Sequence, residues 1–374
     1  MNETLTIRNF GPIKDMSFEL RVVNILIGDQ GTGKSTVAKL LFVIKEMLSI
    51  GDSNTERLES DWNLIHFKEQ LEIVGIRNYL EPRSFIEFRD SFGYFKFDNS
   101  NIEFKIIESE GKNKRTYLAG YIPSYREAVP LLKNSLNAIA AISTTLQKLF
   151  YLFGQKVDNA KTGRPIYNYN DVLDVSYKYV NGMDIIIMKN GEEINIEEAS
   201  SAINSVIPLL LAFDNAIESM YRSGNRIYHY TNEPYLIIEE PELNCFPTTQ
   251  KKIVEHFISN LKFESKDGLD YYLRLIITTH SPYILTSLNN LMYAYAVGQK
   301  EPEEANKIID KKYWMNPGDV STYMLLSNGK CIDIFDREQG LIEAEKIDSV
   351  TNILNEQFSS LLNLQFSENE FDTN

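Results

Sequence analysis

Cysteine is scarce in this sequence, which has only Cys245 and Cys331 among its 374 residues. Two isolated cysteines, with no CxxC pair and no cluster of cysteine and histidine, exclude a disulfide framework and a structural zinc site. We expect both to be reduced packing residues. The chain also lacks a run of about 18 uninterrupted apolar residues, and residues 1–7 have neither the basic start nor the apolar run of a signal peptide. These absences predict a cytoplasmic protein that does not enter a membrane.

Positive charge is also in deficit. The chain has 38 Lys and Arg against 52 Asp and Glu, and its formal net charge is −14. This balance disfavours a surface that attracts nucleic acid broadly, although a local basic groove is not excluded. The chain also lacks internal repeats and low-complexity segments. Its 43% hydrophobic and 24% charged residues are typical of a globular protein with an ample core.

The hydrophobic pattern predicts an α/β protein. The opening residues alternate on both sides of Gly11-Pro12 and predict a β-hairpin, while 22–27 is an apolar run typical of a strand buried on both faces. A glycine-rich loop and a helix follow this strand. Further along, the pattern predicts antiparallel strands over 85–107, a helix over 129–153, a hairpin near Asn181-Gly182, a helix over 202–221, a strand over 235–238, a helix over 247–261, a strand over 273–278, a hairpin of 323–326 with 331–335, and a final helix over 343–362.

The glycine-rich loop, GDQGTGKST, matches the pattern G-x-x-x-x-G-K-[ST] between a predicted strand and a predicted helix. Glycines allow the backbone N–H groups to surround phosphates, and the start of the helix adds partial positive charge. Lys34 is expected to meet the β- and γ-phosphates, and Ser35 to bind Mg²⁺. A plain glycine turn that caps a helix is the weaker reading. The predicted ATP-binding residues here are Gly28, Asp29, Gln30, Gly31, Thr32, Gly33, Lys34, Ser35 and Thr36.

Two adjacent carboxylates follow the apolar strand YLII, in the run EEPE. Ligands bind at the carboxyl ends of strands in open α/β sheets, and successive strand residues point to opposite sides. We therefore assign Glu239 to the metal and Glu240 to the attacking water. Taken alone, EEPE is more typical of a solvated acidic turn, and it is the glycine-rich loop that favours the functional interpretation.

A third buried strand ends in TTHSP, where His280 could contact the γ-phosphate or polarise the water. A lone histidine is more often a hydrogen-bonded structural residue. Its place at a third strand end, after the other two motifs, favours the catalytic interpretation here. The other three histidines have no such context.

The order GDQGTGKST, LIIEEPE, TTHSP resembles the ABC-type ATPase superfamily, especially its SMC-like and OLD-family branch. The resemblance implies ATP and Mg²⁺ as ligands, Lys34 and Ser35 as phosphate and magnesium residues, Glu239 as the Walker B acid, Glu240 as the catalytic glutamate and His280 as the switch histidine. It also implies a single ABC-type P-loop ATPase domain over 1–374, with a mixed sheet, an N-terminal antiparallel β subdomain, a helical signature lobe over 129–222 and an acidic tail over 366–374.

Proteins of this superfamily close a signature loop of a second subunit over the nucleotide, so the resemblance implies a homodimer or a higher oligomer. The best candidate loop is EASSA, with Ser200 and Ser201 before an apolar helix. It departs from the family pattern at Ala202, where glycine is usual. An ordinary N-cap of a core helix fits these residues equally well. A second departure, at 243–247, lacks the histidines that relatives commonly carry and puts the dimer-contacting loop in doubt.

Other segments are less specific. In YIPSYRE, Tyr121 or Arg126 could reach the metal or the γ-phosphate, but an arginine after a proline turn is as often a surface ion pair. Asp333 and Asp336 fit hairpin and turn positions better than a metal pair. The span between the P-loop and the signature loop is too short for a long coiled-coil arm. Relatives that are nucleases carry a C-terminal TOPRIM domain with an acidic metal cluster, whereas the residues after His280 are expected to hold little beyond a hairpin and one helix, which disfavours a built-in nuclease.

Three functions fit these features. The first is a nucleotide-gated dimeric switch that hydrolyses ATP and controls a partner effector protein, as in the bacterial anti-phage defence ATPases that the chain resembles. The alternative is an SMC/RecF-like repair or recombination ATPase that closes a clamp on DNA, and steep salt-dependent DNA affinity would favour it. The third is a scaffold that binds ATP without turnover.

Overall fold

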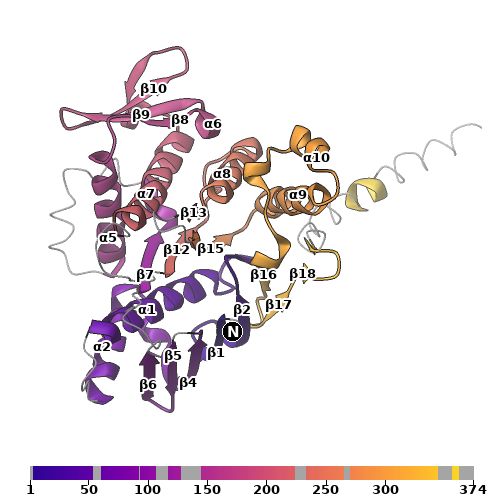
Figure 1. Cartoon of the computed structure of the whole chain (residues 1–374). Coiled ribbons are helices and arrows are strands. Elements are labelled where there is room, and N and C mark those ends of the chain that lie inside the picture. The colour runs from indigo at the N-terminus through magenta and orange to yellow at the C-terminus, as the bar shows by residue number, and fades with distance from the viewer. Residues whose placement is uncertain are drawn as a thin grey trace, which may run out of the picture.

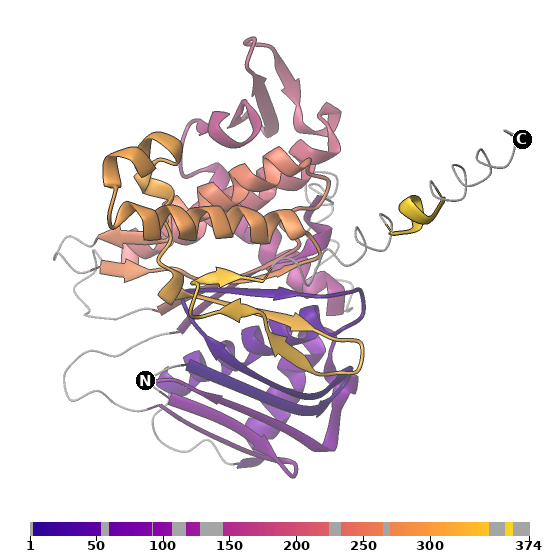
Figure 2. The same cartoon turned by 90° about the vertical axis from the view of Figure 1, so that its right-hand side faces the viewer.

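The structure is a computed structural model built around three main sheets (Figures 1 and 2). It describes residues 3–53, 60–91, 93–106, 117–127, 145–223, 233–264, 270–343 and 356–361. Among these residues no helix combines the length and the apolar character needed to cross a membrane.

The first sheet is antiparallel and lies at the N-terminal end of the molecule, with strand order β2-β1-β4-β5-β6. Its strands are β1 (Glu3–Phe10), β2 (Ile13–Leu20), β4 (Leu80–Arg89), β5 (Gly93–Asp98) and β6 (Asn101–Ile106). In β1, Leu5 and Ile7 are fully buried while Thr4 and Thr6 are more exposed, as the alternating sequence requires. The N-terminal hairpin and the strands predicted over 85–107 are confirmed, apart from residue 107, which lies outside the described residues.

The second sheet, called the central sheet below, has six strands in the order β17-β16-β3-β15-β12-β7. All strands run parallel except β17, which pairs antiparallel with β16. Their bounds are β3 (Val23–Ile27), β7 (Tyr117–Ile122), β12 (Glu233–Glu239), β15 (Arg274–Thr279), β16 (Val320–Leu325) and β17 (Cys331–Asp333). Because parallel neighbours end at one edge of a sheet, β3, β12 and β15 bring the three predicted motifs to the same edge.

Helix α1 (Lys34–Ser53) lies between the two sheets and forms a core with both (Figure 1). Strand β12 shows how the central sheet divides its side chains. Tyr235 and Ile237 join the core around α1, whereas Leu236 and Ile238 join the core on the other face. The second core contains side chains of α5 (Thr145–Lys161), α7 (Ser201–Ser223), α8 (Pro247–Ser259) and α9 (Pro282–Gly298).

The lobe predicted to be helical over 129–222 contains a sheet as well as helices. Helices α5 and α7 pack together, and beside them lies an antiparallel sheet, β11-β10-β9-β8, whose β9–β10 hairpin projects from the molecule (Figure 1). Its strands are β8 (Tyr167–Tyr169), β9 (Val175–Val180), β10 (Met183–Met188) and β11 (Glu193–Asn195). Residues 129–144 of the helix predicted over 129–153 lie outside the described residues.

The predicted hairpin of β16 with β17 is confirmed. Asp333 and Asp336 accept hydrogen bonds from nearby backbone N–H groups, as turn residues do. Of the helix predicted over 343–362, residues 356–361 are helical and 344–355 and 362 lie outside the described residues, as does the predicted acidic tail 366–374. The remaining elements are α2 (Ser60–Ile73), η1 (Arg77–Tyr79), η2 (Ser124–Glu127), α6 (Asn170–Leu173), η3 (Ile196–Glu198), β13 (Lys262–Glu264), β14 (Asp270–Tyr272), α10 (Pro302–Ile308), η4 (Lys311–Tyr313), η5 (Pro317–Asp319), β18 (Phe335–Asp336) and β19 (Leu341–Ile342).

Candidate functional site

The glycine-rich loop joins the buried strand β3 to α1. Gly31 and Gly33 have φ angles of 77° and 101°, which residues with a side chain adopt only with strain. Gly28 also lies against β16, and a Cβ atom there would stand 2.3 Å from the carbonyl oxygen of Leu325. Thr32 Oγ1 donates to the Asp29 carbonyl at 2.8 Å. Close packing and this hydrogen bond therefore fix the loop in a conformation that curls its backbone.

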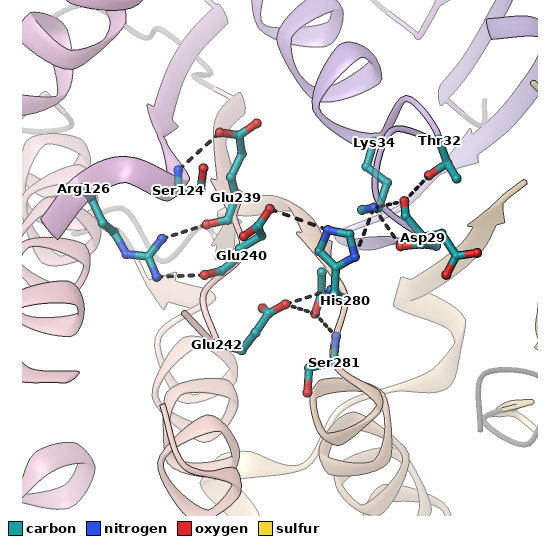
Figure 3. Close-up of polar contacts among 12 residues, drawn as sticks. Asp29, Thr32, Lys34, Ser124, Arg126, Glu239, Glu240, Glu242, His280 and Ser281 are labelled. Carbon is teal, nitrogen blue, oxygen red and sulfur yellow. Dashed lines mark hydrogen bonds and ion pairs between the residues drawn. The ribbon is translucent and has the colours of Figure 1, made fainter. Parts of the chain in front are cut away.

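Glu240 and His280 directly follow β12 and β15, and Lys34 begins α1 after the loop that follows β3. The three side chains meet at this loop (Figure 3). Lys34 Nζ donates to the carbonyls of Gly28 and Asp29 at 2.8 Å each and lies 3.5 Å from His280 Nδ1. His280 Nε2 lies 3.7 Å from Glu240 Oε1. An amine, an imidazole and a carboxylate thus form one chain of contacts at the carboxyl edge of the central sheet.

A cavity of about 500 Å³ opens beside this chain. Its wall is formed by Pro12, Gln30, Gly31, Gly33, Lys34, Ser35, Thr36, Tyr79, Glu240 and His280. Of the other predicted loop residues, Gly28, Asp29 and Thr32 shape the loop instead of lining the cavity. Pro12 and Tyr79 were not predicted. No sequence signal connects them with the P-loop, because only the packing of the N-terminal sheet beside α1 brings them there.

Glu239 is buried and faces a different side from Glu240. Its side chain accepts a hydrogen bond from the Ser124 backbone N–H at 3.3 Å, and its Oε1 has no hydrogen-bond partner among the described residues. Tyr121 lies beside it, and burial, followed by the negative charge of Glu239, raises the pKa of Tyr121 well above its usual value. A buried carboxylate oxygen without a donor is suited to a cation.

Of the two residues assigned to Mg²⁺, Ser35 lines the cavity and Glu239 does not. No group of three or more His, Cys, Asp or Glu residues gathers as a metal cage in the described part of the chain. Magnesium in nucleotide sites is held by one or two protein oxygens together with phosphates and water. The hydroxyl of Ser35 and the carboxylate of Glu239 supply oxygen atoms of this kind, so these two residues fit Mg²⁺.

Glu240 has an unusual backbone, with φ at 45°. This left-handed conformation costs a non-glycine residue roughly 1–2 kcal/mol, and here it is held in part by a hydrogen bond from the Glu240 N–H to the Thr278 carbonyl at 2.8 Å. Burial raises the pKa of the Glu240 carboxyl, and nearby His280 opposes that change. A carboxylate with a raised pKa accepts a proton more readily than an exposed one, which suits a group that activates water.

Glu242 is a further site residue that the sequence did not single out. Its Oε1 accepts hydrogen bonds from the His280 N–H at 2.8 Å and from Thr279 Oγ1 at 2.7 Å. It therefore fixes the backbone that carries the histidine. The available signal was the third acid of EEPE, two residues beyond Glu240.

The structure corrects both interpretations of Arg126. Its side chain is fully buried, so it is not a surface ion pair, and it does not line the cavity. Instead it donates at 2.8 Å to each of the backbone carbonyls of Glu239 and Glu240 (Figure 3). Burial lowers the pKa of the Arg126 guanidinium to about 10.

Ser200 and Ser201 are exposed at the start of α7 and do not line the P-loop cavity. The Ser200 hydroxyl accepts from the Ile203 N–H at 3.4 Å, as a weak helix cap. Their assignment to a nucleotide held by a second subunit stays a prediction.

A parallel sheet with a glycine-rich loop, a lysine-capped cavity and acidic strand ends defines a P-loop nucleotide-binding protein. The family described as AAA ATPase domain matches residues 1–129 and 119–285, and the chain belongs to this family. A search of curated proteins gave no significant match.

Solved structures with a similar course of the chain include a SmcHead bound to the C-winged helix domain of ScpA, at 9% identity and a TM-score of 0.44, covering 91% of this chain and 99% of that one. An SMC head domain from Thermotoga maritima matches at 10% identity and a TM-score of 0.38, covering 89% and 98%. The recombination mediator protein RecF with ATPrS matches at 11% identity and 0.42, covering 89% and 98%.

Proposed function

We propose that this protein hydrolyses ATP by in-line attack of water on the γ-phosphate. Glu240 orients and deprotonates the water, His280 positions the carboxylate, and Lys34 binds the phosphates. Ser35 and Glu239 would hold Mg²⁺, which would supply positive charge next to the phosphate oxygens. The observation that carries the proposal is the contact chain Lys34–His280–Glu240 on the wall of the P-loop cavity.

We further propose that hydrolysis operates a dimeric switch. The exposed serines at the start of α7 lie outside the cavity of their own chain. In a dimer, the serines of one copy could therefore close over the nucleotide bound by the other copy. The switch would then control a partner protein, as in the anti-phage defence ATPases that the sequence resembles. ATP would promote the closed dimer, and hydrolysis would open it.

Phosphate release tests the catalytic part of the proposal. We expect Glu240→Gln to lower kcat by about 100-fold or more, because it removes the base, while ATP still binds. Lys34→Ala is expected to abolish ATP binding. Glu303→Gln, which makes the same change at an exposed position in α10, should leave both unchanged.

Light scattering of Glu240→Gln with ATP adds a test of the switch. Since this variant traps ATP, its mass should double when ATP is added and return when ATP is removed. Equal and negligible phosphate release by the wild type and Glu240→Gln would instead support a scaffold that binds ATP without turnover. A mass that ignores ATP would overturn the dimeric switch alone.

A further inference from the structure

The segment η2 (Ser124–Glu127) contacts two parts of the molecule: the lobe that contains α5 and α7, called the signature lobe below, and the turn at Glu239 and Glu240, called the catalytic turn below. It follows β7, the strand that pairs with β12, and it packs against α7. On the lobe side, the Tyr125 ring stacks on Phe150 of α5 with centroids 6.0 Å apart. On the catalytic side, Glu127 Oε2 accepts from Asn244 Nδ2 at 2.6 Å. A four-residue segment therefore contacts both parts at once.

Arg126 makes the most direct connection. Its Nε donates to the Ser205 carbonyl of α7 at 3.0 Å, while Nη1 and Nη2 donate to the Glu239 and Glu240 carbonyls. Nη1 also donates to the Pro123 carbonyl at 3.3 Å. Ser205 lies little more than one turn from the start of α7. One buried side chain thus touches the helix that begins with the candidate signature serines and the two residues assigned to metal and water.

The chemistry of these bonds is specific to arginine. The guanidinium is planar and its donors stand in a fixed fork, so bonds to two successive carbonyls fix how those peptide units are turned relative to each other. Lysine carries a compact ammonium that cannot reproduce this geometry. In the described residues no carboxylate forms an ion pair with Arg126, and its hydrogen-bond partners are backbone carbonyls. Such partners position a backbone and leave the acidic side chains free for ligands.

The turn that Arg126 holds is the strained one. Glu240 has its φ at 45°, and its carbonyl accepts from Arg126 while its N–H donates to the Thr278 carbonyl. A shift of α7 that moves the Ser205 carbonyl would alter the guanidinium, and with it the direction in which the Glu240 carboxylate points. The pairing of Glu240 with His280 depends on that direction.

We propose that Arg126 is a positioning residue that couples the start of α7 to the Glu239–Glu240 turn, so that closure of a second copy on α7 sets the catalytic carboxylate. This inference rests on the proposed ATP hydrolysis and on the proposed closure of two copies over ATP. It assigns no contact with ATP to Arg126.

Steady-state ATP hydrolysis by Arg126→Lys tests the coupling. The charge remains but the fork is lost, so we expect kcat to fall about 10- to 100-fold through misplacement of the carboxylate. The KM for ATP should change by less than about threefold, because the P-loop is untouched. Arg83→Lys, the same change at an exposed site, should match the wild type. An unchanged kcat, or a rise in KM with kcat retained, would overturn the proposal.

A double-mutant cycle with Ser201→Ala separates coupling from a merely structural role. If Arg126 transmits the engagement of α7, the double variant should be no slower than the slower single variant, since both act on one step. If the kcat of the double variant falls by the product of the two single losses, the two residues act independently and the coupling is refuted. Should Arg126→Lys fail to fold, Glu127→Ala offers the same cycle at an exposed residue of η2, with a loss in kcat of about threefold expected and the same criterion.

Failure of the coupling and failure of the proposed function give different results. A wild-type protein that releases no phosphate at any ATP concentration would overturn both the proposed function and the coupling. A wild type that hydrolyses ATP, with additive effects of Arg126→Lys and Ser201→Ala, would overturn the coupling alone.

Discussion

Glu239 and Glu240 are adjacent and chemically identical, yet the fold gives them different environments. Glu239 is the last residue of β12 and is only 3% exposed, with its carboxylate beside the Ser124 N–H. Glu240 is half-buried, begins the turn and faces His280. The strand pleat separates their directions, and the left-handed backbone of Glu240 increases the separation. Two equal side chains are thereby suited to two different tasks.

Tyr79 provides a test of how the cavity recognises a nucleotide. The residue is 38% exposed and lines the cavity with Pro12, and its ring stands edge-on to Phe10 with centroids 6.1 Å apart. We expect Tyr79→Ala to raise the KM for ATP at least about fivefold with little change in kcat, because stacking of a base on an aromatic ring contributes about 1–3 kcal/mol.

The control for Tyr79 is Tyr79→Phe, which keeps the ring and should keep the KM. The nucleotide titration can be followed by fluorescence of a labelled ATP analogue or by steady-state kinetics. If Tyr79→Ala binds ATP as the wild type does, the base lies elsewhere in the cavity and Tyr79 serves only to pack against Gly11.

At the scale of elements, a buried ion cluster ties α1 to both sheets. Lys45 of α1 is fully buried, with Nζ 3.0 Å from Glu3 Oε1 of β1 and 3.6 Å from Asp90 Oδ2 after β4. The ammonium also faces the Phe88 and Tyr235 rings at 4.0 and 3.7 Å. Burial lowers the pKa of Lys45, and the two carboxylates oppose that change. The helix that follows the P-loop is therefore fixed in place by charge as well as by apolar packing.

We expect Lys45→Met to reduce the free energy of unfolding by about 3–5 kcal/mol, since it leaves buried carboxylates without their cation. Urea denaturation measures the change. Lys189→Met, at a side chain that is 81% exposed, should change the free energy by less than about 0.5 kcal/mol. Equal stability of both variants would mean that the cluster contributes little beyond the packing of its methylene groups.

At the scale of the whole molecule, net charge limits the partners. A formal charge of −14 repels a polyanion, and each neutralised phosphate of bound DNA would steepen the dependence of affinity on salt. We therefore expect weak affinity for duplex DNA at about 0.15 M salt, with a log–log salt slope close to zero, both without nucleotide and with ATP bound to Glu240→Gln.

Fluorescence anisotropy over a salt series checks this expectation. A steep negative slope would indicate several phosphate contacts and would favour the repair or recombination ATPase over the switch. A slope that appears only with ATP would place the DNA contact in the closed dimer.

The sequence by itself determined which motifs meet at the carboxyl edge of the central sheet. Apolar runs before GDQGTGKST, EEPE and THSP predicted three buried strands, and the placement of polar motifs at their ends predicted where they would meet. Local pattern suffices here because a strand buried on both faces must be apolar and because phosphate binding demands glycines, a lysine and a helix start in a fixed order. The N-terminal hairpin followed equally from alternation and a turn.

Only the tertiary structure decided the surroundings of that edge. Pro12 and Tyr79 reach the cavity because the N-terminal sheet packs beside α1, and no spacing in the chain records that contact. Arg126 was expected near the phosphates or at the surface, yet it is buried against the backbone of Glu239 and Glu240. Its partners are carbonyls, which every residue carries, so no side-chain pattern could identify them. Contacts made by the backbone of distant segments depend on packing in three dimensions, and a one-dimensional pattern does not contain them.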